Sequence, residues 1–378
     1  MKKIIKKMSV LFLSIFCVFV SLLVVEVVLR IWGPPQIRLV GTKLLLKKNI
    51  TTKNSCYFDS DKIKKNIVVT KNSLGFRGPE PPENFYKHLS LVAVGGSTTE
   101  CIFITEGKTW TDYLQSNLLT YFPDIWINNA GIDGHSTYGH IELMRQYVGK
   151  LRPDYVLFLV GINDMAVEGE SIQDKQQISE ENVIGKSIIQ KIRDNSMILA
   201  FYKFQKDKKI GHDMFTMKTT IKEYNSIVNY KVLGASTDYD AVTSQDLERI
   251  NNNLMAYRNR LERLVLLTKS YSIHPILVTQ PAVYGFGVDD VTGIDLGNIP
   301  IVEFTEPGVT RSGKDKWMIL QKYNEVTREV SSEFGIPLID LAMEMPKSTK
   351  YFYDYIHFTE EGAQKVGEIV TKNLIKIL

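Results

Sequence analysis

Four short segments of the sequence carry residue types that acyl transfer requires. They read GGSTT at residues 95–99, AGIDG at 130–134, GIND at 161–164 and DYIHFT at 354–359. The first three each follow a short apolar run, and the fourth precedes an amphipathic pattern. Because the carboxyl ends of neighbouring parallel strands lie along one edge of a sheet, we expect these segments to converge.

The chemistry predicted at this edge is attack by an activated serine hydroxyl. Ser97 is a weak nucleophile until a base removes its proton. His357 is the natural base, since the pKa of an imidazole lies near neutral pH. Asp354, three residues before it, can hold the imidazole tautomer and stabilise the imidazolium that forms. We therefore predict Ser97, His357 and Asp354 as the catalytic residues.

The tetrahedral intermediate of acyl transfer carries an oxyanion, which needs hydrogen-bond donors in defined positions. We expect these donors to be the backbone amides of Ser97 and Gly131 and the side chain of Asn163. Each segment alone has a structural interpretation, because Gly-Gly-Ser commonly forms a turn and Asn163-Asp164 can cap a helix. All four together, in this order and each at the end of an element, favour catalysis.

Short, β-branched apolar runs predict the strands that position these segments. They lie at residues 91–94, 125–127, 155–160, 276–279 and 336–339. Runs of this length without alternation are typical of strands buried on both faces. Between them, apolar residues recur at steps of three and four, most clearly over 247–264 and 363–377. This alternation predicts an α/β fold with a parallel sheet covered on both faces.

Further polar residues lie near the predicted site. Gln280 and Tyr284 follow the fourth apolar run, and we predict that they contact the substrate. His135 and His140, with Asp133, could imitate a metal cluster, but their spacing is not that of a zinc site. Histidines of a loop near the cleft are the favoured interpretation. The sequence predicts no metal and no cofactor, and it contains no glycine-rich phosphate loop.

The N-terminus has the pattern of a membrane anchor. An apolar run without charge begins at Met8 after four lysines, and residues 8–32 are long enough to span a lipid bilayer. Glu26 and Arg30 interrupt its far end at a spacing that allows them to pair on a helix. The small residues that precede the cleavage site of a secretory or lipoprotein signal are missing. We expect an uncleaved anchor, with the N-terminus in the cytoplasm and the remainder outside.

We expect the chain to divide into three parts. Residues 1–33 would hold the cytoplasmic tip and the anchor, 34–89 a stalk or lead-in, and 90–378 the catalytic domain. Within that domain, residues 165–245 are polar and only weakly helical. A segment of this length between core elements is interpreted as an insertion that either serves as a lid or is partly disordered.

The net charge of the chain bears on its binding partners, and the cysteines bear on its disulfides. The formal net charge of +4 is accounted for by the four lysines before Met8, which leaves the remainder neutral. The positive charge therefore concerns membrane topology, and we expect no nucleic-acid partner. Cys56 and Cys101 would lie outside the cytoplasm, where a disulfide is permitted, but two cysteines favour free thiols.

The chemistry-bearing residues resemble the four sequence blocks of the SGNH, or GDSL-type, hydrolase superfamily. The blocks contribute Ser, Gly, Asn and His, which here are Ser97, Gly131, Asn163 and His357. The resemblance covers residue 90 to the C-terminus without the 165–245 insertion. It implies a three-layer α/β/α fold with a flavodoxin-like sheet and a Ser-His-Asp triad. The family's first block reads Gly-Asp-Ser, whereas here Gly96 replaces the aspartate, as in envelope-anchored relatives.

These features predict a membrane-anchored, extracytoplasmic serine esterase. We expect it to remove small O-acyl groups, acetyl above all, from an envelope or exported polysaccharide, because the anchor restricts it to targets near the membrane. One alternative is an O-acyltransferase that uses the same triad with a membrane partner. Another is a non-catalytic scaffold subunit of the same fold, although such a subunit has no need for all four predicted residues.

Overall fold

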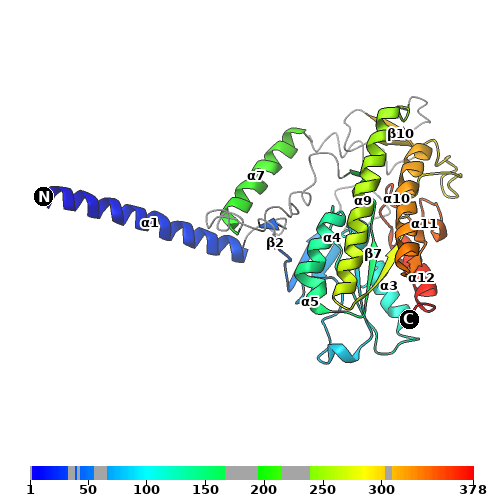
Figure 1. Ribbon diagram of the computed structural model, residues 1–378, viewed down its shortest axis with the longest axis horizontal. Helices are drawn as coiled ribbons and strands as arrows, with labels where there is room; N and C mark the ends of the chain where they lie inside the picture. The colour runs from blue at the N-terminus through cyan, green and yellow to red at the C-terminus, as the bar shows by residue number, and fades with distance from the viewer. Residues whose placement is uncertain are drawn as a thin grey trace. The chain divides into compact units, whose positions relative to one another are not determined.

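The computed structural model describes residues 2–32, 39–40, 43–54, 66–166, 195–214, 239–302 and 309–378 (Figure 1). The chain forms two compact units. The smaller comprises Met1–Leu45 and Ser179–Met217, and the larger comprises Leu46–Ile178 and Lys218–Leu378. The lead-in predicted from the sequence at 34–89 is therefore divided between the two units.

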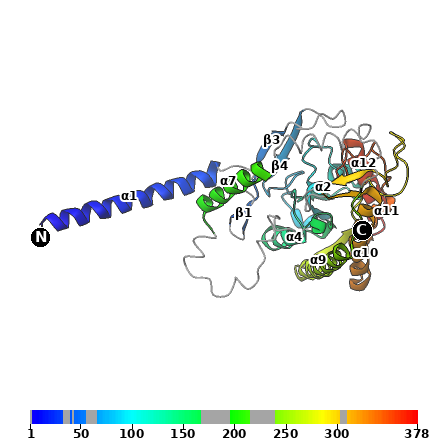
Figure 2. The ribbon, with the colours of Figure 1, turned by 90° about the horizontal axis from the view of Figure 1, so that it is seen from above.

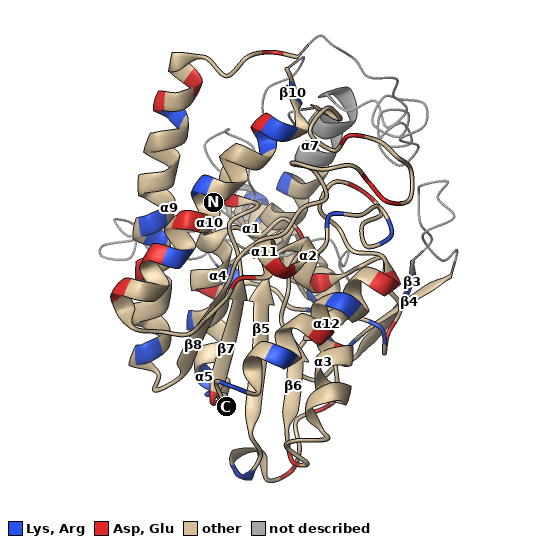
Figure 3. Cartoon of the chain, turned by 90° about the vertical axis from the view of Figure 1, so that its right-hand side faces the viewer, with Lys and Arg blue, Asp and Glu red and all other residues tan. Residues whose placement is uncertain are grey.

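A five-stranded parallel sheet forms the centre of the larger unit (Figure 3). Its order is β11-β8-β7-β5-β6, and every neighbouring pair is parallel. The strands are β5 (Ser90–Gly95), β6 (Trp126–Asn129), β7 (Tyr155–Leu159), β8 (His274–Val278) and β11 (Leu338–Ile339). The first strand in sequence lies between the second and the third, which is the flavodoxin-like order. The predicted fold class is confirmed.

Helices cover both faces of this sheet. They are α2 (Ser97–Glu100), α3 (Trp110–Leu118), α4 (Thr137–Leu143), α5 (Gly149–Leu151), α9 (Ser244–Ser270), α10 (Gly313–Phe334), α11 (Leu341–Glu344) and α12 (Glu360–Leu374). Helix α3 packs against α12, and α9 packs against α4 and α10. Figure 2 shows α4, α9 and α10 on the opposite side of the unit from α12. Cover on both sides explains why every residue of β5 and β6 is buried.

Capping residues set the starts of the long helices. Thr109 and Asp112 form a reciprocal capping box at α3, and Thr243 and Asp246 form one at α9. The Thr359 hydroxyl accepts a hydrogen bond from the amide of Gly362 at the start of α12. These caps satisfy amides that have no partner within the helix. Through the last of these caps, α12 begins at Glu360, shortly after His357.

Smaller elements complete the larger unit. An antiparallel pair, β3 (Ile50–Asn54) and β4 (Ile67–Lys71), precedes the sheet, and β9 (Pro300–Val302) pairs with β10 (Thr310–Ser312). The short helical turns are η1 (Phe85–Lys87), η2 (Met144–Val148) and η3 (Asp164–Ala166).

The described residues of the smaller unit form two helices and one short strand pair. They are α1 (Lys2–Trp32), α7 (Met197–Met214), β1 (Leu39–Val40) and β2 (Lys43–Leu44). Within α1, Ile5–Trp32 is long and apolar enough to cross a bilayer, with a mean hydropathy of 2.8, and a signal sequence has the same character. The predicted pair of Glu26 and Arg30 is confirmed at 2.6 Å.

Two expectations fall largely outside the described residues. Of the insertion predicted at 165–245, the structure describes residues 165–166, 195–214 and 239–245. Helix α7, in this insertion, belongs to the smaller unit and contacts α1. Cys56 is not described, whereas Cys101 is buried and has a free thiol.

Candidate active site

The predicted nucleophile lies at the sharp turn that follows β5. Ser97 is the first residue of α2, a helix of four residues, and only 7% of its surface is exposed. The first amides of a helix have no intrahelical acceptor. Within the described ranges, the Ser97 amide has no other acceptor either. This N–H is therefore available to a ligand beside the serine hydroxyl.

A hydrogen-bonded chain joins the three predicted catalytic residues. The distance from Ser97 Oγ to His357 Nε2 is 2.7 Å, and that from His357 Nδ1 to Asp354 Oδ2 is 2.6 Å. The other Asp354 oxygen accepts hydrogen bonds from the amides of Ile356 and His357, at 2.9 and 2.7 Å. The carboxylate is thus held from two sides, and its orientation sets that of the imidazole. This is the geometry in which an imidazole can accept the serine proton.

The charges around His357 favour its protonated form. Burial by itself would lower the pKa of His357. The Asp354 carboxylate opposes this effect through its charge and its hydrogen bond, and the Asp133 carboxylate adds to it. As a result, the pKa of His357 is raised above its ordinary value of 6.5. The imidazolium formed during catalysis is stabilised accordingly.

A tight turn presents His357 to the sheet edge. Phe352 and Phe358 form an isolated antiparallel bridge across it, and the Tyr353 amide donates a hydrogen bond to the His357 carbonyl oxygen at 3.0 Å. The Tyr353 ring stacks on the imidazole with a centroid distance of 5.6 Å and an interplanar angle of 9°. This stacking was not anticipated from the sequence, because it depends on how the turn folds back on itself.

Asn163 lies directly beside the nucleophile turn. Its Nδ2 donates a hydrogen bond to the His135 carbonyl oxygen at 2.8 Å. The second hydrogen of this amide has no acceptor in the described part of the chain. A Cβ atom at position 96 would overlap Nδ2 of Asn163. Gly96, which stands where the family pattern has aspartate, therefore allows the Asn163 amide to approach the serine turn.

Gly131 also packs against the nucleophile turn, but its amide is occupied. A Cβ on Gly131 would lie 2.8 Å from the Thr99 carbonyl carbon, so only glycine allows this approach. The Gly131 N–H donates to Asn129 Oδ1 at 2.9 Å, and Asn129 Nδ2 donates to the Thr99 carbonyl oxygen at 2.5 Å. Of the three predicted oxyanion donors, Ser97 and Asn163 each have an N–H available. The Gly131 N–H is already hydrogen-bonded to the Asn129 side chain.

The two predicted substrate contacts lie in the core. Gln280 has no exposed surface, and its side chain donates to the Pro281 carbonyl oxygen and accepts from the Thr98 hydroxyl. Tyr284 is 1% exposed and packs edge-on against Tyr355. Both side chains are thus enclosed by other protein groups in this structure. Their role in substrate binding stays a prediction. In the structure, Gln280 is hydrogen-bonded to Thr98 beside the predicted nucleophile, and Tyr284 packs against Tyr355.

The two histidines considered as metal ligands are both buried. His140 lies inside α4 rather than in a loop, and burial lowers its pKa to about 4, so it is neutral. His135 contributes its carbonyl oxygen to Asn163. Among the described residues, no group of three or more His, Cys, Asp and Glu side chains is arranged to hold a metal ion.

Cys101, four residues after the serine, is the other nucleophilic side chain at this turn. Burial raises the pKa of the Cys101 thiol to about 12, so the thiol stays protonated. Its Sγ donates to the Thr98 carbonyl oxygen at 3.3 Å. Of these two side chains, the Ser97 hydroxyl is the one that is hydrogen-bonded to His357.

The sequence model of the GDSL-like lipase/acylhydrolase family matches residues 93–365. This range is more than half of the chain and includes all four chemistry-bearing segments. The chain belongs to the GDSL-like lipase/acylhydrolase family. It is a serine hydrolase of ester bonds, as the resemblance of its four blocks implied.

This GDSL-like acylhydrolase is also similar to solved structures, at low identity. Axe2, an acetylxylan esterase from Geobacillus stearothermophilus, is 14% identical over 75% of this chain and 93% of its own, with a TM-score of 0.40. LAE5, an alpha/beta hydrolase enzyme from the metagenome of Lake Arreo in Spain, is 15% identical over 75% and 94%, with a TM-score of 0.39. No curated protein sequence matches the chain.

Several supporting residues of the acylhydrolase were not anticipated from the sequence. The buried Asp164 carboxylate accepts hydrogen bonds from Thr137 and Arg260, and so holds α4 and α9 beside Asn163. The buried Glu100 carboxylate accepts from Lys71 and from the Asp133 amide. In the sequence, Asp164 ends the third chemistry-bearing segment and Glu100 directly follows the first, and neither position reveals a partner.

Proposed function

We propose that this chain is a membrane-anchored extracytoplasmic esterase that removes small O-acyl groups, above all acetyl, from an envelope or exported polysaccharide. The observation that carries the proposal is the hydrogen-bonded chain from Ser97 Oγ through His357 to Asp354, at 2.7 and 2.6 Å. Family membership supports ester hydrolysis, and the triad supplies its mechanism.

In the first half-reaction, Ser97 Oγ attacks the ester carbonyl carbon while His357 Nε2 takes the hydroxyl proton. The carbonyl π electrons move onto oxygen, where the Ser97 amide and the Asn163 side chain donate hydrogen bonds. Collapse of this intermediate breaks the bond to the alcohol oxygen, which leaves with the proton from His357. Water then attacks the acyl-serine by the same steps, releasing the carboxylic acid and restoring Ser97.

The N-terminal helix supports the membrane location. Ile5–Trp32 has the length and hydropathy of a span, and the four lysines before Met8 favour an N-terminus in the cytoplasm. An anchor of this kind restricts the enzyme to esters near the membrane, such as those of envelope polysaccharides.

The test of the esterase uses the full chain in detergent with an aryl acetate. Ser97→Ala should abolish both turnover and labelling by a fluorophosphonate, since only an activated serine reacts with that probe. Its melting temperature should stay near that of wild type. Wild-type turnover in the folded variant would place the nucleophile elsewhere, and release of acyl product only with a sugar acceptor would indicate an acyltransferase.

A separate test concerns topology. An alkaline phosphatase fused after Leu378, which is active only outside the cytoplasm, should be active in cells that express the fusion. A β-galactosidase at the same position should be inactive. The opposite pair of results would overturn the proposed orientation while leaving the esterase untouched.

A further inference from the structure

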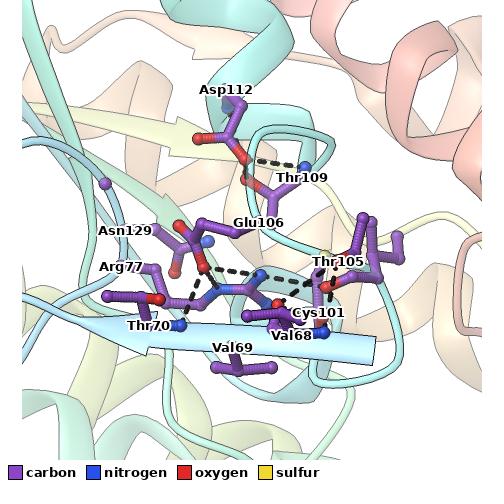
Figure 4. Close-up of polar contacts among 12 residues, drawn as sticks. Val68, Val69, Thr70, Arg77, Cys101, Thr105, Glu106, Thr109, Asp112 and Asn129 are labelled. Atoms are coloured by element: carbon purple, nitrogen blue, oxygen red, sulfur yellow. Dashed lines mark hydrogen bonds and ion pairs between the residues drawn. The ribbon is translucent and has the colours of Figure 1, made fainter. Parts of the chain in front are cut away.

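The fully buried Arg77 lies behind the nucleophile turn, outside the range matched by the family. The sequence shows it only as an arginine within a turn-rich segment of the lead-in. Its side chain donates five hydrogen bonds, to the carbonyl oxygens of Glu100, Cys101 and Ile104 and twice to Glu106. A guanidinium has five N–H groups, so all of them are used. Figure 4 shows this group enclosed between β4 and the turn.

Two of the carbonyl groups that Arg77 binds, those of Glu100 and Cys101, lie at the end of α2, and the third lies in the loop that follows. Helix α2 has only four residues, too few to be stable by itself, so its position depends on tertiary contacts. It ends at Cys101, which has left-handed backbone angles of φ 54° and ψ 49°. Such angles are costly for a residue with a Cβ and persist when the surroundings hold them. Arg77 binds the carbonyl oxygens on both sides of this point, at 2.8 Å for Glu100 and 2.7 Å for Cys101.

The backbone of Arg77 is joined to the second catalytic segment. Its N–H donates to the Asn129 carbonyl oxygen, and the Asn129 N–H donates to the Arg77 carbonyl oxygen, both at 2.9 Å. The Asn129 side chain in turn holds the amide of Gly131 and the carbonyl of Thr99. One residue therefore links the turn that carries Ser97 with the strand end that carries Gly131.

Glu106 completes the arrangement. Its Oε2 accepts from Arg77 at 3.2 Å and from the Thr70 amide in β4 at 3.0 Å. The Glu106 amide donates to the Val68 carbonyl oxygen at 2.9 Å. The lead-in strand β4 is thus fastened to the loop that follows the nucleophile helix, as the dashed lines of Figure 4 indicate.

We infer that Arg77 is a positioning residue of the active site, which holds the Ser97 hydroxyl and amide in register with His357 and Asn163. This inference rests on the proposed esterase function. Arg77 does not touch the reacting atoms; it acts through the carbonyl groups at the end of α2. The part of the lead-in that carries Arg77 then contributes to the geometry of the active site and is not a stalk.

The test compares the full-length wild type with Arg77→Lys. Lysine keeps the charge but loses the planar fork, and its three donors cannot reach the same set of carbonyl groups. We expect kcat for an aryl acetate, per folded molecule, to fall by about 10- to 100-fold, because small displacements of a nucleophile have effects of this size. KM should stay close to wild type, since the turn affects attack more than binding. Amide hydrogen exchange over residues 96–106 should accelerate by about tenfold or more.

A second variant and a matched control keep the test decisive. Glu106→Gln retains an acceptor oxygen at a side chain that is 29% exposed, so it should fold and show a smaller loss of kcat. Arg311 is a buried arginine that also donates to two backbone carbonyls, those of Asp240 and Ala241, and pairs with Asp246. Arg311→Lys should lower the melting temperature but leave kcat and exchange over 96–106 unchanged.

Three outcomes separate the interpretations. A loss of kcat and faster exchange in the Arg77 variant, without them in the Arg311 variant, support the inference. If folded Arg77→Lys keeps the wild-type kcat, Arg77 stabilises the fold without positioning the nucleophile. If Arg77→Lys does not fold, a wild-type kcat in Glu106→Gln leads to the same conclusion. A wild-type chain that hydrolyses no ester would refute the proposed function itself, and the inference with it.

Discussion

We propose two functions for Asn163, one in the structure of its loop and one in the transition state. Its hydrogen bond to the His135 carbonyl oxygen supports the loop, and its second N–H is available to the oxyanion. We expect Asn163→Ala to lose about 1 kcal/mol of stability from the first function. Loss of the second should cost roughly 2.7–4 kcal/mol in the transition state, or 10²–10³ in kcat, with KM nearly unchanged. Steady-state kinetics and thermal melting of the same sample measure both.

Asn163→Asp serves as the companion variant. It should be at least as damaging to kcat, because it places a carboxylate beside the forming oxyanion. A large fall in melting temperature with kcat almost intact would assign Asn163 to the structure alone. The oxyanion would then be stabilised by the Ser97 amide. The Gly131 amide could contribute only after breaking its hydrogen bond to Asn129.

The raised pKa of His357 predicts the pH dependence of catalysis. The imidazole must be neutral to accept the Ser97 proton, so activity is lost as pH falls through the pKa of His357. Because Asp354 and Asp133 raise this pKa, the acid limb of kcat/KM should lie above the ordinary value of 6.5. Asp354→Asn should move the limb to lower pH and reduce kcat by about 10⁴-fold.

Asp133→Asn is the matched control for this profile. It removes a charge but no catalytic hydrogen bond to the imidazole, so it should shift the acid limb in the same direction and by less. Its kcat at the plateau should remain near wild type. An acid limb that stays in place in both variants would show that another group limits activity at low pH.

At the scale of elements, the fit between the nucleophile turn and the β7 loop depends on Gly96. A Cβ at this position would overlap the Asn163 amide, so Gly96→Ala should displace it and lower kcat by about 10²-fold, the size of losing one donor. In the Asn163→Ala background the same change should have little further effect, because the group that it displaces is already absent. A double-mutant cycle on kcat measures this coupling.

Equal losses from Gly96→Ala in both backgrounds would contradict this account. Gly96→Asp, which restores the family's Gly-Asp-Ser pattern, should also lower activity here. The reason is the same overlap, which the carboxylate makes larger.

At the scale of the whole molecule, helix α7 of the insertion belongs with the N-terminal helix. The Glu26 carboxylate accepts hydrogen bonds from the amides of Met197 and Ile198, at 2.8 and 3.1 Å, and so caps the start of α7. Val40 and Met197 form a buried cluster in the same unit. These contacts are made by α1, α7 and the segment after α1, whereas every predicted catalytic residue lies in the larger unit.

Replacing residues 179–217 by a Gly/Ser linker should therefore leave turnover of a small aryl acetate close to wild type. We expect the preference between that ester and an acetylated polysaccharide to change, since long segments at the edge of a domain commonly select substrates. The ratio of kcat/KM for the two esters measures the effect, and the melting temperature is the control. Complete loss of aryl acetate turnover in a folded variant would show that this segment serves catalysis directly.

The sequence by itself determined the order of the elements and the chemistry at their ends. Unbroken apolar runs indicate strands buried on both faces, and the residues directly after such strands must lie at one sheet edge. For this reason the sequence alone assigns Ser97, Gly131 and Asn163 to one predicted site. The Asp354–His357 pair was also accessible, because a separation of three residues makes its hydrogen bond local.

Only the tertiary structure decided which side chains meet across long separations. Ser97 and His357 are 260 residues apart, and their contact depends on tertiary packing such as that of α12 against α3. Gln280 and Tyr284 were expected in the pocket, but the period of a strand says nothing about the loop after it, and both are buried. Arg77 appeared as a turn residue, because the carbonyl groups that bind it have no signature in the sequence. Periodicity reports burial along an element, whereas partners depend on how elements pack in space.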